Sequence, residues 1–343
     1  GAVASGIDPA REDTFRALVL EGGVRYLHAW PVRGDLRAVR LPVSLRRTKH
    51  GEPPGPGERI TYHDVASYEG VAGDDHVVDG VWPEDSLAGP ETVCANLSAS
   101  DPGLVAARRS SRVHQQRDPV RGRAWTDRTR PEERAVGTIF NYEYLDAGQT
   151  FEGLVLVEGA TQEAVQERFD EVRASLRGAL LLGRSRRAGY GGEAALDWKL
   201  PRAREIEGAG VLHGPVRAGT QFRALLTSPC IARSELSGQV DPAALPAQLE
   251  ARLGKRARVT RRRWDFALVG GFNRHWGLEL PQALAVSAGS VLVLEATEDI
   301  PHEALLVAER EGVGERRVEG FGRVCFLDAP TEAPTLRNHD DDA

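Results

Sequence analysis

The sequence predicts an α+β protein built from two copies of one structural unit. Residues 183–191 read G-R-S-R-R-A-G-Y-G, and residues 314–322 repeat the pattern without a gap as G-E-R-R-V-E-G-F-G. Each stretch follows a segment with helical periodicity and precedes a strand-like segment, so the order strand, helix, glycine loop, strand occurs twice. The length of 343 residues also fits two domains better than one.

Periodicity and turn residues place the elements of both copies. The predicted helices have apolar residues at steps of three or four, and they cover 15–20, 161–182, 242–253 and 301–309. Thr161 is expected to cap the second of these helices. The predicted strands are short apolar or alternating runs, at 24–30, 138–145, 151–157, 193–200, 211–216, 221–228, 286–296 and 324–327. The strands at 138–145 and 151–157 are expected to form a hairpin with each other.

The chain is predicted to divide into a first domain at 1–200, a second domain at 201–330 and an acidic disordered tail at 331–343. Residues 105–136 are rich in arginine and lack an apolar period, which predicts a basic loop inserted in the first domain. Such a loop is either a functional surface or a solvated insertion, and the composition leaves both open.

Composition restricts the class of protein. No run approaches the roughly 20 apolar residues that span a bilayer, and the first residues do not form a signal peptide. Three distant cysteines (Cys94, Cys230 and Cys325) have no zinc spacing and favour a reducing, cytoplasmic setting. Because the chain has no methionine, even at position 1, we expect that residue 1 is not the native start. No nucleotide-binding or serine-hydrolase motif is present, so no cofactor is predicted.

The charge pattern is compatible with a localised nucleic-acid contact. A net charge of −6 argues against a surface that binds nucleic acid everywhere. All but three of the 44 basic residues are arginine, however. A GC-rich genome would explain this bias. The consequence is the same in either case, because arginine binds phosphate and stacks on bases better than lysine does.

The glycine loops are the best candidates for function. Glycine permits a close backbone approach, arginine offers planar donors to phosphate, and an aromatic ring can stack on a splayed base. Alternatively, the glycines serve only helix–sheet packing. Two copies with adjacent arginines favour RNA contact, for which Arg186 and Arg317 occupy matching places. Because the second loop also carries Glu315 and Glu319, it could instead contact protein.

The basic stretches at 108–134 and 255–263 could extend the RNA-binding surface of the glycine loops. The three arginines before Trp264 also have an aromatic stacking surface beside them. The predicted RNA-binding residues are Gly183, Arg184, Ser185, Arg186, Arg187, Gly189, Tyr190, Gly191, Arg112, His114, Arg117, Arg261, Arg262, Arg263, Arg316, Arg317, Gly320, Phe321 and Gly322.

Catalytic candidates are sparse. His28, His114, His213 and His275 are scattered, and a lone histidine is more often structural than catalytic. No group of residues has defensible metal-ligand spacing. The sequence therefore predicts no catalytic residue and no metal.

These motifs resemble a known family. The loop form G-x-x-R-x-x-G-[YF]-G is similar to the hallmark of the RAMP superfamily of CRISPR-associated proteins. The wider chain resembles the tandem-domain RAMP subunit of type III-D effector complexes. The stretches that carry this likeness are G-G-V-R-Y-L-H-A-W-P (22–31), L-P-V-S-L-R-R-T-K (41–49), R-V-H-Q-Q-R-D-P (112–119) and I-F-N-Y-E-Y-L-D-A-G-Q-T-F-E-G (139–153). Together with the loops, the resemblance covers residues 22–328.

The resemblance implies two tandem ferredoxin-like (RRM-like, βαββαβ) domains with long insertions. The family begins with a strand and a small-residue motif that are not visible here, so we expect the N-terminal strand to be missing. The implied function is a non-catalytic, RNA-binding subunit of a type III CRISPR ribonucleoprotein in cytoplasmic antiviral defence. Such a subunit holds the 5′ repeat-derived end of the CRISPR RNA (crRNA) and caps a filament of backbone RAMP subunits.

The implied partners are crRNA, the large polymerase-like subunit, the backbone RAMP subunits, the small subunit and, indirectly, target RNA; no membrane is involved. Two alternatives remain open at this point. The chain could be a RAMP endoribonuclease that processes or cleaves RNA, or an assembly subunit that makes only protein contacts.

Overall fold

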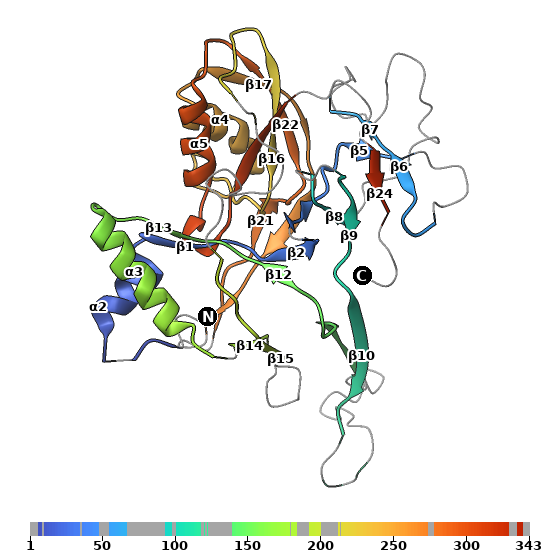
Figure 1. Cartoon of the computed structure of the whole chain (residues 1–343), viewed down its shortest axis with the longest axis vertical. Helices are drawn as coiled ribbons and strands as arrows, with labels where there is room; N and C mark the ends of the chain where they lie inside the picture. The colour runs from blue at the N-terminus through green and yellow to red at the C-terminus, as the bar shows by residue number, and fades with distance from the viewer. Residues whose placement is uncertain are drawn as a thin grey trace. The chain divides into compact units, whose positions relative to one another are not determined.

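The structure is a computed structural model (Figure 1). It describes residues 6–8, 10–34, 36–47, 55–66, 93–97, 101–117, 120, 122, 139–178, 180–183, 192–199, 212, 214–273, 278–328 and 335–338. The chain forms two compact units. We call Gly1–Ala106, Phe151–Leu180 and Ala195–Ala343 the main unit, and Ala107–Thr150 with Leu181–Ala194 the ribbon unit.

The second half of the main unit is a four-stranded antiparallel sheet in the order β17-β22-β16-β23. Its elements follow one another as strand, helix, strand, strand, helix, strand. They are β16 (Gln221–Leu226), α4 (Leu245–Arg252), β17 (Ala257–Arg263), β22 (Val291–Ala296), α5 (His302–Glu311) and β23 (Val324–Asp328). This connectivity and strand order define the ferredoxin-like βαββαβ fold, which confirms the predicted fold class.

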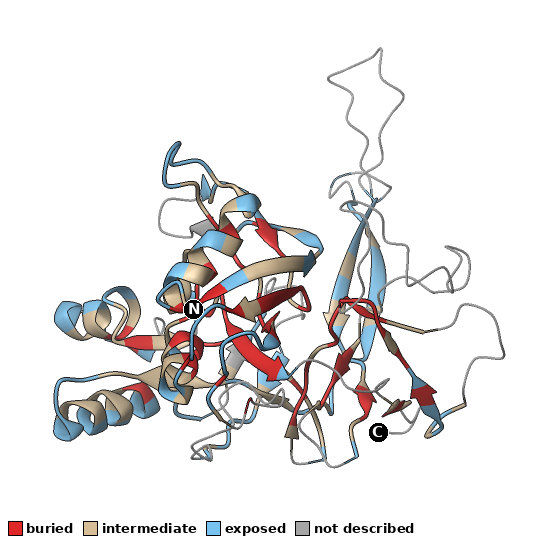
Figure 2. Ribbon diagram, turned by 90° about the horizontal axis from the view of Figure 1, so that it is seen from above, coloured by how far each residue is buried: buried red, intermediate tan, exposed pale blue. Residues whose placement is uncertain are grey.

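One face of this sheet holds the main core. The central strand β22 is apolar except at Glu295, and β16 is apolar except at Gln221 and Arg223, as expected of strands largely buried on both faces. Helices α4 and α5 lie over one face, as Figure 1 shows. Phe222 and Phe326 from the sheet meet Leu249 and Leu305 from these helices. The strands of the sheet are accordingly among the most buried parts of the chain (Figure 2).

The opposite face of the sheet is also covered. Leu225, Val291 and Val293 on this face pack against Val39 and Ala66 from the N-terminal half of the main unit. The β17–β22 pairing contains a register shift between Val259 and Arg261, and β17 forms one edge of the sheet.

The first half of the main unit contains part of a second, related unit. Strand β1 (Val24–Tyr26) pairs antiparallel with β13 (Val155–Val157), and helix α3 (Gln162–Ser175) follows directly. The Thr161 side chain accepts a hydrogen bond of 3.3 Å from the Ala164 N–H, so the predicted cap is confirmed. Among the described residues, this half shows two sheet strands and one helix of the expected unit, whereas the second half shows the whole unit.

A short N-terminal helical segment packs against the core of this half. It consists of α2 (Glu12–Phe15) and the π-helix η1 (Arg16–Leu20). Leu18 from η1 and Val172 from α3 are buried together with Val24. Within the described residues, no helix is long and apolar enough to span a bilayer.

The remaining strands are short and form small antiparallel sheets. In the main unit these are β12 (Phe151–Glu152) with β2 (Trp30–Arg33) and β3 (Leu36–Arg37); β4 (Val39–Arg40) with β8 (Cys94–Ala95) and β9 (Leu104–Val105); β5 (Leu45–Arg46) with β7 (His63–Asp64); β6 (Arg59–Thr61) with β24 (Thr335–Arg337); β18 (Phe266–Val269) with β21 (Ala283–Val286); and β19 (Phe272–Asn273) with β20 (Leu278–Glu279). The single turns η4 (Pro242–Ala244) and η5 (Arg317–Glu319) are 3₁₀-helical. Strand β14 (Leu180–Leu182) pairs with β15 (Gly192–Ala194).

The ribbon unit is built on a long antiparallel pair. Strand β10 (Arg109–Gln115) pairs along its whole length with β11 (Ile139–Leu145). A loop was predicted for residues 105–136, but β10 lies within that range. The predicted hairpin between 138–145 and 151–157 is also wrong, because β11 pairs with β10 whereas β12 and β13 pair with β2 and β1.

Other element boundaries also differ from the prediction. The helix expected at 161–182 ends at Ser175, and Leu180–Leu182 form strand β14 instead. The strand expected at 286–296 is two strands, β21 and β22, with a turn between them where the Ser290 N–H donates to the Ser287 carbonyl. The strand expected to end before Pro31 resumes as β2, in which Pro31 lies opposite Phe151. Part of the predicted disordered tail is β24, which pairs with β6.

Candidate nucleic-acid interface

One face of the ribbon unit combines aromatic and basic side chains. In the β10–β11 register, Ser110, Arg112 and His114 lie opposite Tyr144, Tyr142 and Phe140. Because successive side chains of a strand alternate between faces, these six share one face of the ribbon. We call it the aromatic face.

The rings of the aromatic face pack against each other. The His114 imidazole is stacked on Phe140, with ring centroids 5.4 Å apart and an interplanar angle of 12°. Tyr142 meets both rings edge-on, at 5.3 Å from His114 and 5.2 Å from Phe140. The Arg112 guanidinium lies 5.7 Å from the Tyr144 ring centroid. Cross-strand aromatic pairs of this kind stabilise a two-stranded ribbon that would otherwise be marginal.

The opposite face of the ribbon has a different composition. It carries Val113 and Ile139, whose exposed fractions are 72% and 65%. Arg109 on this face forms an ion pair of 2.9 Å with Glu143. The aromatic face therefore differs from its reverse in offering ring systems beside a guanidinium, which is the chemistry that binds single-stranded RNA.

The structure brings together two of the predicted RNA-binding residues on this face, Arg112 and His114. Arg117 is also in the ribbon unit and is exposed. Gly183 is exposed too, but the rest of the first glycine loop lies outside the described residues, as do His213 and His275. The predicted residues outside the described part are Arg184, Ser185, Arg186, Arg187, Gly189, Tyr190 and Gly191.

The second glycine loop is packed into the main unit. A Cβ atom on Gly320 would lie 2.5 Å from the Tyr26 carbonyl oxygen and 2.9 Å from Leu27 Cα, so glycine permits the close approach to the end of β1. A Cβ on Gly322 would overlap the Val313 carbonyl oxygen. Both glycines have positive φ, at 86° and 69°.

The side chains of this loop have partners within the chain. The Arg316 Nε donates a hydrogen bond of 2.7 Å to the Glu319 carboxylate. The Arg316 guanidinium lies 4.7 Å from the Phe321 ring centroid. Phe321 also meets His28 edge-on, with centroids 5.0 Å apart. Arg317 donates 3.3 Å to the Glu311 carbonyl. These interactions agree with the alternative that the second loop serves internal packing, while RNA contact by its residues stays a prediction.

The last turn of α5 gathers three arginines, of which the sequence singled out only Arg317. Arg25 and Arg323 donate to the Arg310 carbonyl at 2.8 and 2.7 Å, beside the Arg317 hydrogen bond to the neighbouring carbonyl. Burial lowers the pKa of Arg25, Glu158 opposes this effect, and the charges of Arg317 and Arg323 lower the pKa further. Arg25 and Arg323 have no basic neighbour in the sequence, so no local pattern placed them beside Arg317.

The second basic stretch lies on edge strand β17. Arg262 is 4.6 Å from the Trp264 ring centroid, and Trp264 lies 5.7 Å from Phe266. The predicted adjacency of charge and stacking surface is therefore present, although the guanidinium already covers the indole. Arg261 and Arg263 are half-buried.

The sheet face opposite helices α4 and α5 is buried, whereas the corresponding face of an RRM domain is open to RNA. RRM domains stack bases on the sheet face opposite their helices. Here that face is packed against Val39 and Ala66. This face is therefore not exposed for base stacking as it is in RRM domains. Among the described residues, no three histidine, cysteine or acidic side chains form a group that could hold a metal ion.

No family model matches the chain, and no curated protein matches it. Three solved structures show a distant likeness. A CRISPR endoribonuclease Cse3 bound to a 19-nucleotide RNA shares 21% identity at a TM-score of 0.25, covering 41% of this chain and 65% of Cse3. The chain thus matches just under two thirds of the length of that protein.

The other two likenesses are of the same kind. Cse3 of Thermus thermophilus bound to an RNA that represents a pre-cleavage complex shares 17% identity at a TM-score of 0.24, covering 64% of this chain and 79% of that one. A second form of the Cse3–RNA complex shares 18% identity at a TM-score of 0.26, covering 55% and 75%. The fold assignment rests on the strand order of the sheet.

One prediction is corrected at this point. The sequence predicted a chain without catalytic activity, whereas two of these similar structures are described as endoribonuclease complexes and the third as a pre-cleavage complex. We therefore do not retain the prediction that the chain is not an enzyme.

Proposed function

We propose that this chain is a RAMP-type protein that binds CRISPR RNA through the aromatic face of the ribbon unit. The observation that supports the proposal is the packing of His114, Phe140 and Tyr142 on one strand-pair face beside Arg112. Rings can stack on unpaired bases while the guanidinium neutralises a neighbouring phosphate. No such combination occurs on the reverse face among the described residues.

The finer assignment follows from the sequence motifs. Within this proposal, the chain belongs to a type III effector complex, holds the 5′ repeat-derived end of the crRNA and caps the filament of backbone RAMP subunits. Its neighbours are then the large polymerase-like subunit, the backbone subunits and the small subunit. The resemblance of both glycine loops and of residues 139–153 to the type III-D subunit supports this placement.

The test measures binding of the full chain to fluorescently labelled, single-stranded repeat RNA at constant salt. Removing one stacking ring costs about 1–3 kcal/mol, so we expect Tyr142→Ala to weaken RNA binding by roughly tenfold or more. Asn141→Ala is the matched control, because Asn141 is the neighbouring residue on the reverse face. Tyr142→Phe keeps the ring and should bind nearly as well as the unmodified chain.

Equal binding by the Tyr142→Ala and Asn141→Ala variants would contradict the proposal. Circular dichroism and urea unfolding of each variant would distinguish weaker RNA stacking from an unfolded ribbon. A Tyr142→Ala variant that unfolds is replaced by Arg112→Gln, which leaves the packed rings in place.

RNA cleavage is a second candidate function, favoured by the position of His114. This imidazole lies on the aromatic face two residues from Arg112, where it could accept a proton from a ribose hydroxyl while the guanidinium balances charge on the phosphate. Incubation with repeat RNA tests this role. His114→Phe keeps a stacking ring but cannot transfer a proton, so we expect cleavage to be abolished and binding to remain. Cleavage by His114→Phe at the original rate would exclude His114 as the base.

A further inference from the structure

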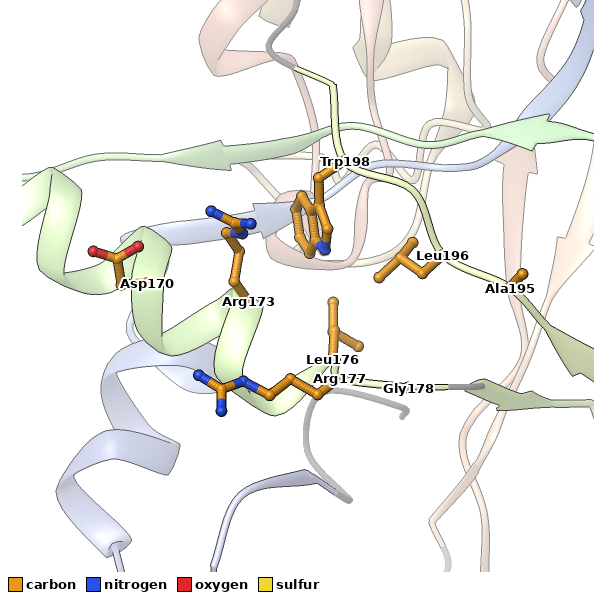
Figure 3. A pocket seen from close by; sticks show the side chains of 8 residues that line it. All are labelled: Asp170, Arg173, Leu176, Arg177, Gly178, Ala195, Leu196 and Trp198. Carbon is orange, nitrogen blue, oxygen red and sulfur yellow. The ribbon is translucent and has the colours of Figure 1, made fainter.

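A cavity of about 690 Å³ lies in the main unit, between the end of α3 and the segment 195–198 (Figure 3). Its volume falls within the range of about 300–1,000 Å³ that is usual for small-molecule sites. It is distinct from the aromatic face, which belongs to the ribbon unit.

The walls of this cavity are apolar and include one large aromatic ring. Figure 3 shows the side chains of Leu176, Leu196 and Trp198 converging on the same space. Phe169 meets Trp198 edge-on, with centroids 5.7 Å apart and an interplanar angle of 87°. This packing fixes the orientation of the indole without covering it on the cavity side. Leu196 is 40% exposed, so a ligand that entered would cover apolar surface now in contact with water.

The polar groups of the cavity are mainly cationic. Arg173 and Arg177 line it together with Asp170, which already accepts a hydrogen bond of 3.1 Å from Gln166. Among the described residues, Arg177 has no carboxylate partner. The end of α3 adds roughly half a negative charge. The two guanidinium groups outweigh that partial charge and one carboxylate, so the cavity favours an anion.

We infer that this cavity binds a nucleotide, with its base against Trp198 and the two leucines and its phosphate at Arg177. An aromatic ring and aliphatic walls suit a planar base, and a guanidinium suits a phosphate. Asp170 can accept a hydrogen bond from an exocyclic amino group, which favours adenine, cytosine or guanine over uracil. A purely apolar peptide side chain would leave both guanidinium groups without a counter-ion.

The nucleotide could be free or part of single-stranded RNA, because both present the same base and phosphate. The inference does not depend on RNA binding by the aromatic face. Isothermal titration of the full chain with adenosine monophosphate, adenosine and uridine monophosphate provides the first measurement. We expect the adenine nucleotide to bind best and removal of its phosphate to weaken binding about tenfold.

Arg177→Ala is the test variant, and Arg217→Ala is its matched control. Arg217 is an exposed arginine of the same unit that pairs with Asp299 and lies outside the cavity. We expect Arg177→Ala to weaken adenosine monophosphate binding about tenfold, whereas Arg217→Ala binds like the unmodified chain. Leu196→Glu places a carboxylate in the cavity wall, which would repel the phosphate, so this variant should not bind the nucleotide.

Competition identifies the source of the nucleotide. Displacement of adenosine monophosphate by short single-stranded RNA assigns the cavity to an RNA nucleotide, and no displacement assigns it to a free nucleotide. No binding of any nucleotide or RNA at the cavity, or equal weakening in Arg177→Ala and Arg217→Ala, would overturn the inference. Tyr142→Ala should retain nucleotide binding, so failure of the proposed function and failure of this inference can be distinguished.

Discussion

Gly320 lies against the backbone of Tyr26 at a distance that leaves no room for a side chain. A Cβ atom would come within 2.5 Å of the Tyr26 carbonyl oxygen, and the glycine has φ +86°. We expect Gly320→Ala to lower the free energy of unfolding by about 3 kcal/mol or more, because left-handed strain and backbone overlap both contribute. Urea unfolding followed by tryptophan fluorescence measures the change.

Gly219→Ala separates these two contributions. Gly219 has a similar φ of +80°, but no atom lies within 4 Å of its added Cβ. Its substitution should therefore cost only the conformational strain, about 1–2 kcal/mol. If the two variants lose equal stability, the approach of the glycine loop to β1 does not contribute to the fold.

Arg112 should determine part of the salt dependence of RNA binding. It lies on the aromatic face near Tyr144. Each phosphate of single-stranded RNA that a protein neutralises contributes about 0.7 to the slope of log affinity against log salt. We therefore expect Arg112→Gln to reduce this slope by about 0.7. Fluorescence anisotropy from low to moderate salt measures it.

Arg109→Gln is the control for this experiment, since Arg109 lies on the same strand but faces the other way and pairs with Glu143. Its slope should stay close to that of the unmodified chain. A slope reduced equally in both variants would indicate a general charge effect rather than neutralisation of a phosphate by Arg112.

Alkaline pH should destabilise the protein through a buried thiol. Burial raises the pKa of Cys230 to about 12, from an ordinary value near 9. The folded chain keeps this proton while the unfolded chain releases it, so the contribution to stability is complete below about pH 9 and declines as pH rises toward 12. The urea midpoint should fall over this range. Cys230→Ala should flatten the fall, and an unchanged slope would exclude the thiol.

Tyr26 also lowers the stability of the fold as pH rises, over a slightly higher pH range than Cys230. Burial raises its pKa to about 12 as well, and its hydroxyl donates 3.0 Å to the Leu18 carbonyl. Some alkaline decrease in stability should therefore remain in Cys230→Ala. Tyr26→Phe combined with Cys230→Ala should remove most of the rest.

The second half of the fold could be predicted because its local patterns agree with its tertiary structure. Helices α4 and α5 show apolar steps of three or four, and β16 and β22 are mostly apolar. The strand predicted at 286–296 was too long at its start, because the turn between β21 and β22 has apolar residues on both sides.

The candidate site could be predicted only in part. Arg112 and His114 were found from composition, but the strand that holds them was not. The sequence R-S-S-R-V-H-Q has no apolar alternation, because neither face of the ribbon packs on a core. Its partner β11 lies beyond a long intervening segment, and local periodicity carries no information about pairing at that separation. The same holds for Arg25, which meets α5 only through the tertiary fold.

Asp64 and Arg223 form a buried ion pair, and its removal should be costly. The exposed fractions of their side chains are 3% and 13%. Asp64 also accepts a hydrogen bond of 3.0 Å from the Ala66 N–H, and the Arg223 Nε donates a hydrogen bond of 2.9 Å to the Asp328 carbonyl. Burial lowers the pKa of Arg223, and Asp64 opposes that effect. We expect Asp64→Ala to cost about 3–5 kcal/mol, since an arginine is left buried without its carboxylate.

Replacing both partners tests whether this cost comes from the isolated charge. The double variant Asp64→Leu with Arg223→Met should recover most of the stability, because neither residue then needs a counter-ion. Glu315→Gln is the exposed comparison, since Glu315 and its partner Arg233 are 40% and 42% exposed. Its cost should stay below about 1 kcal/mol. A double variant as unstable as Asp64→Ala would show that the packing of Val39 and Ala66 on the sheet, rather than charge, depends on this pair.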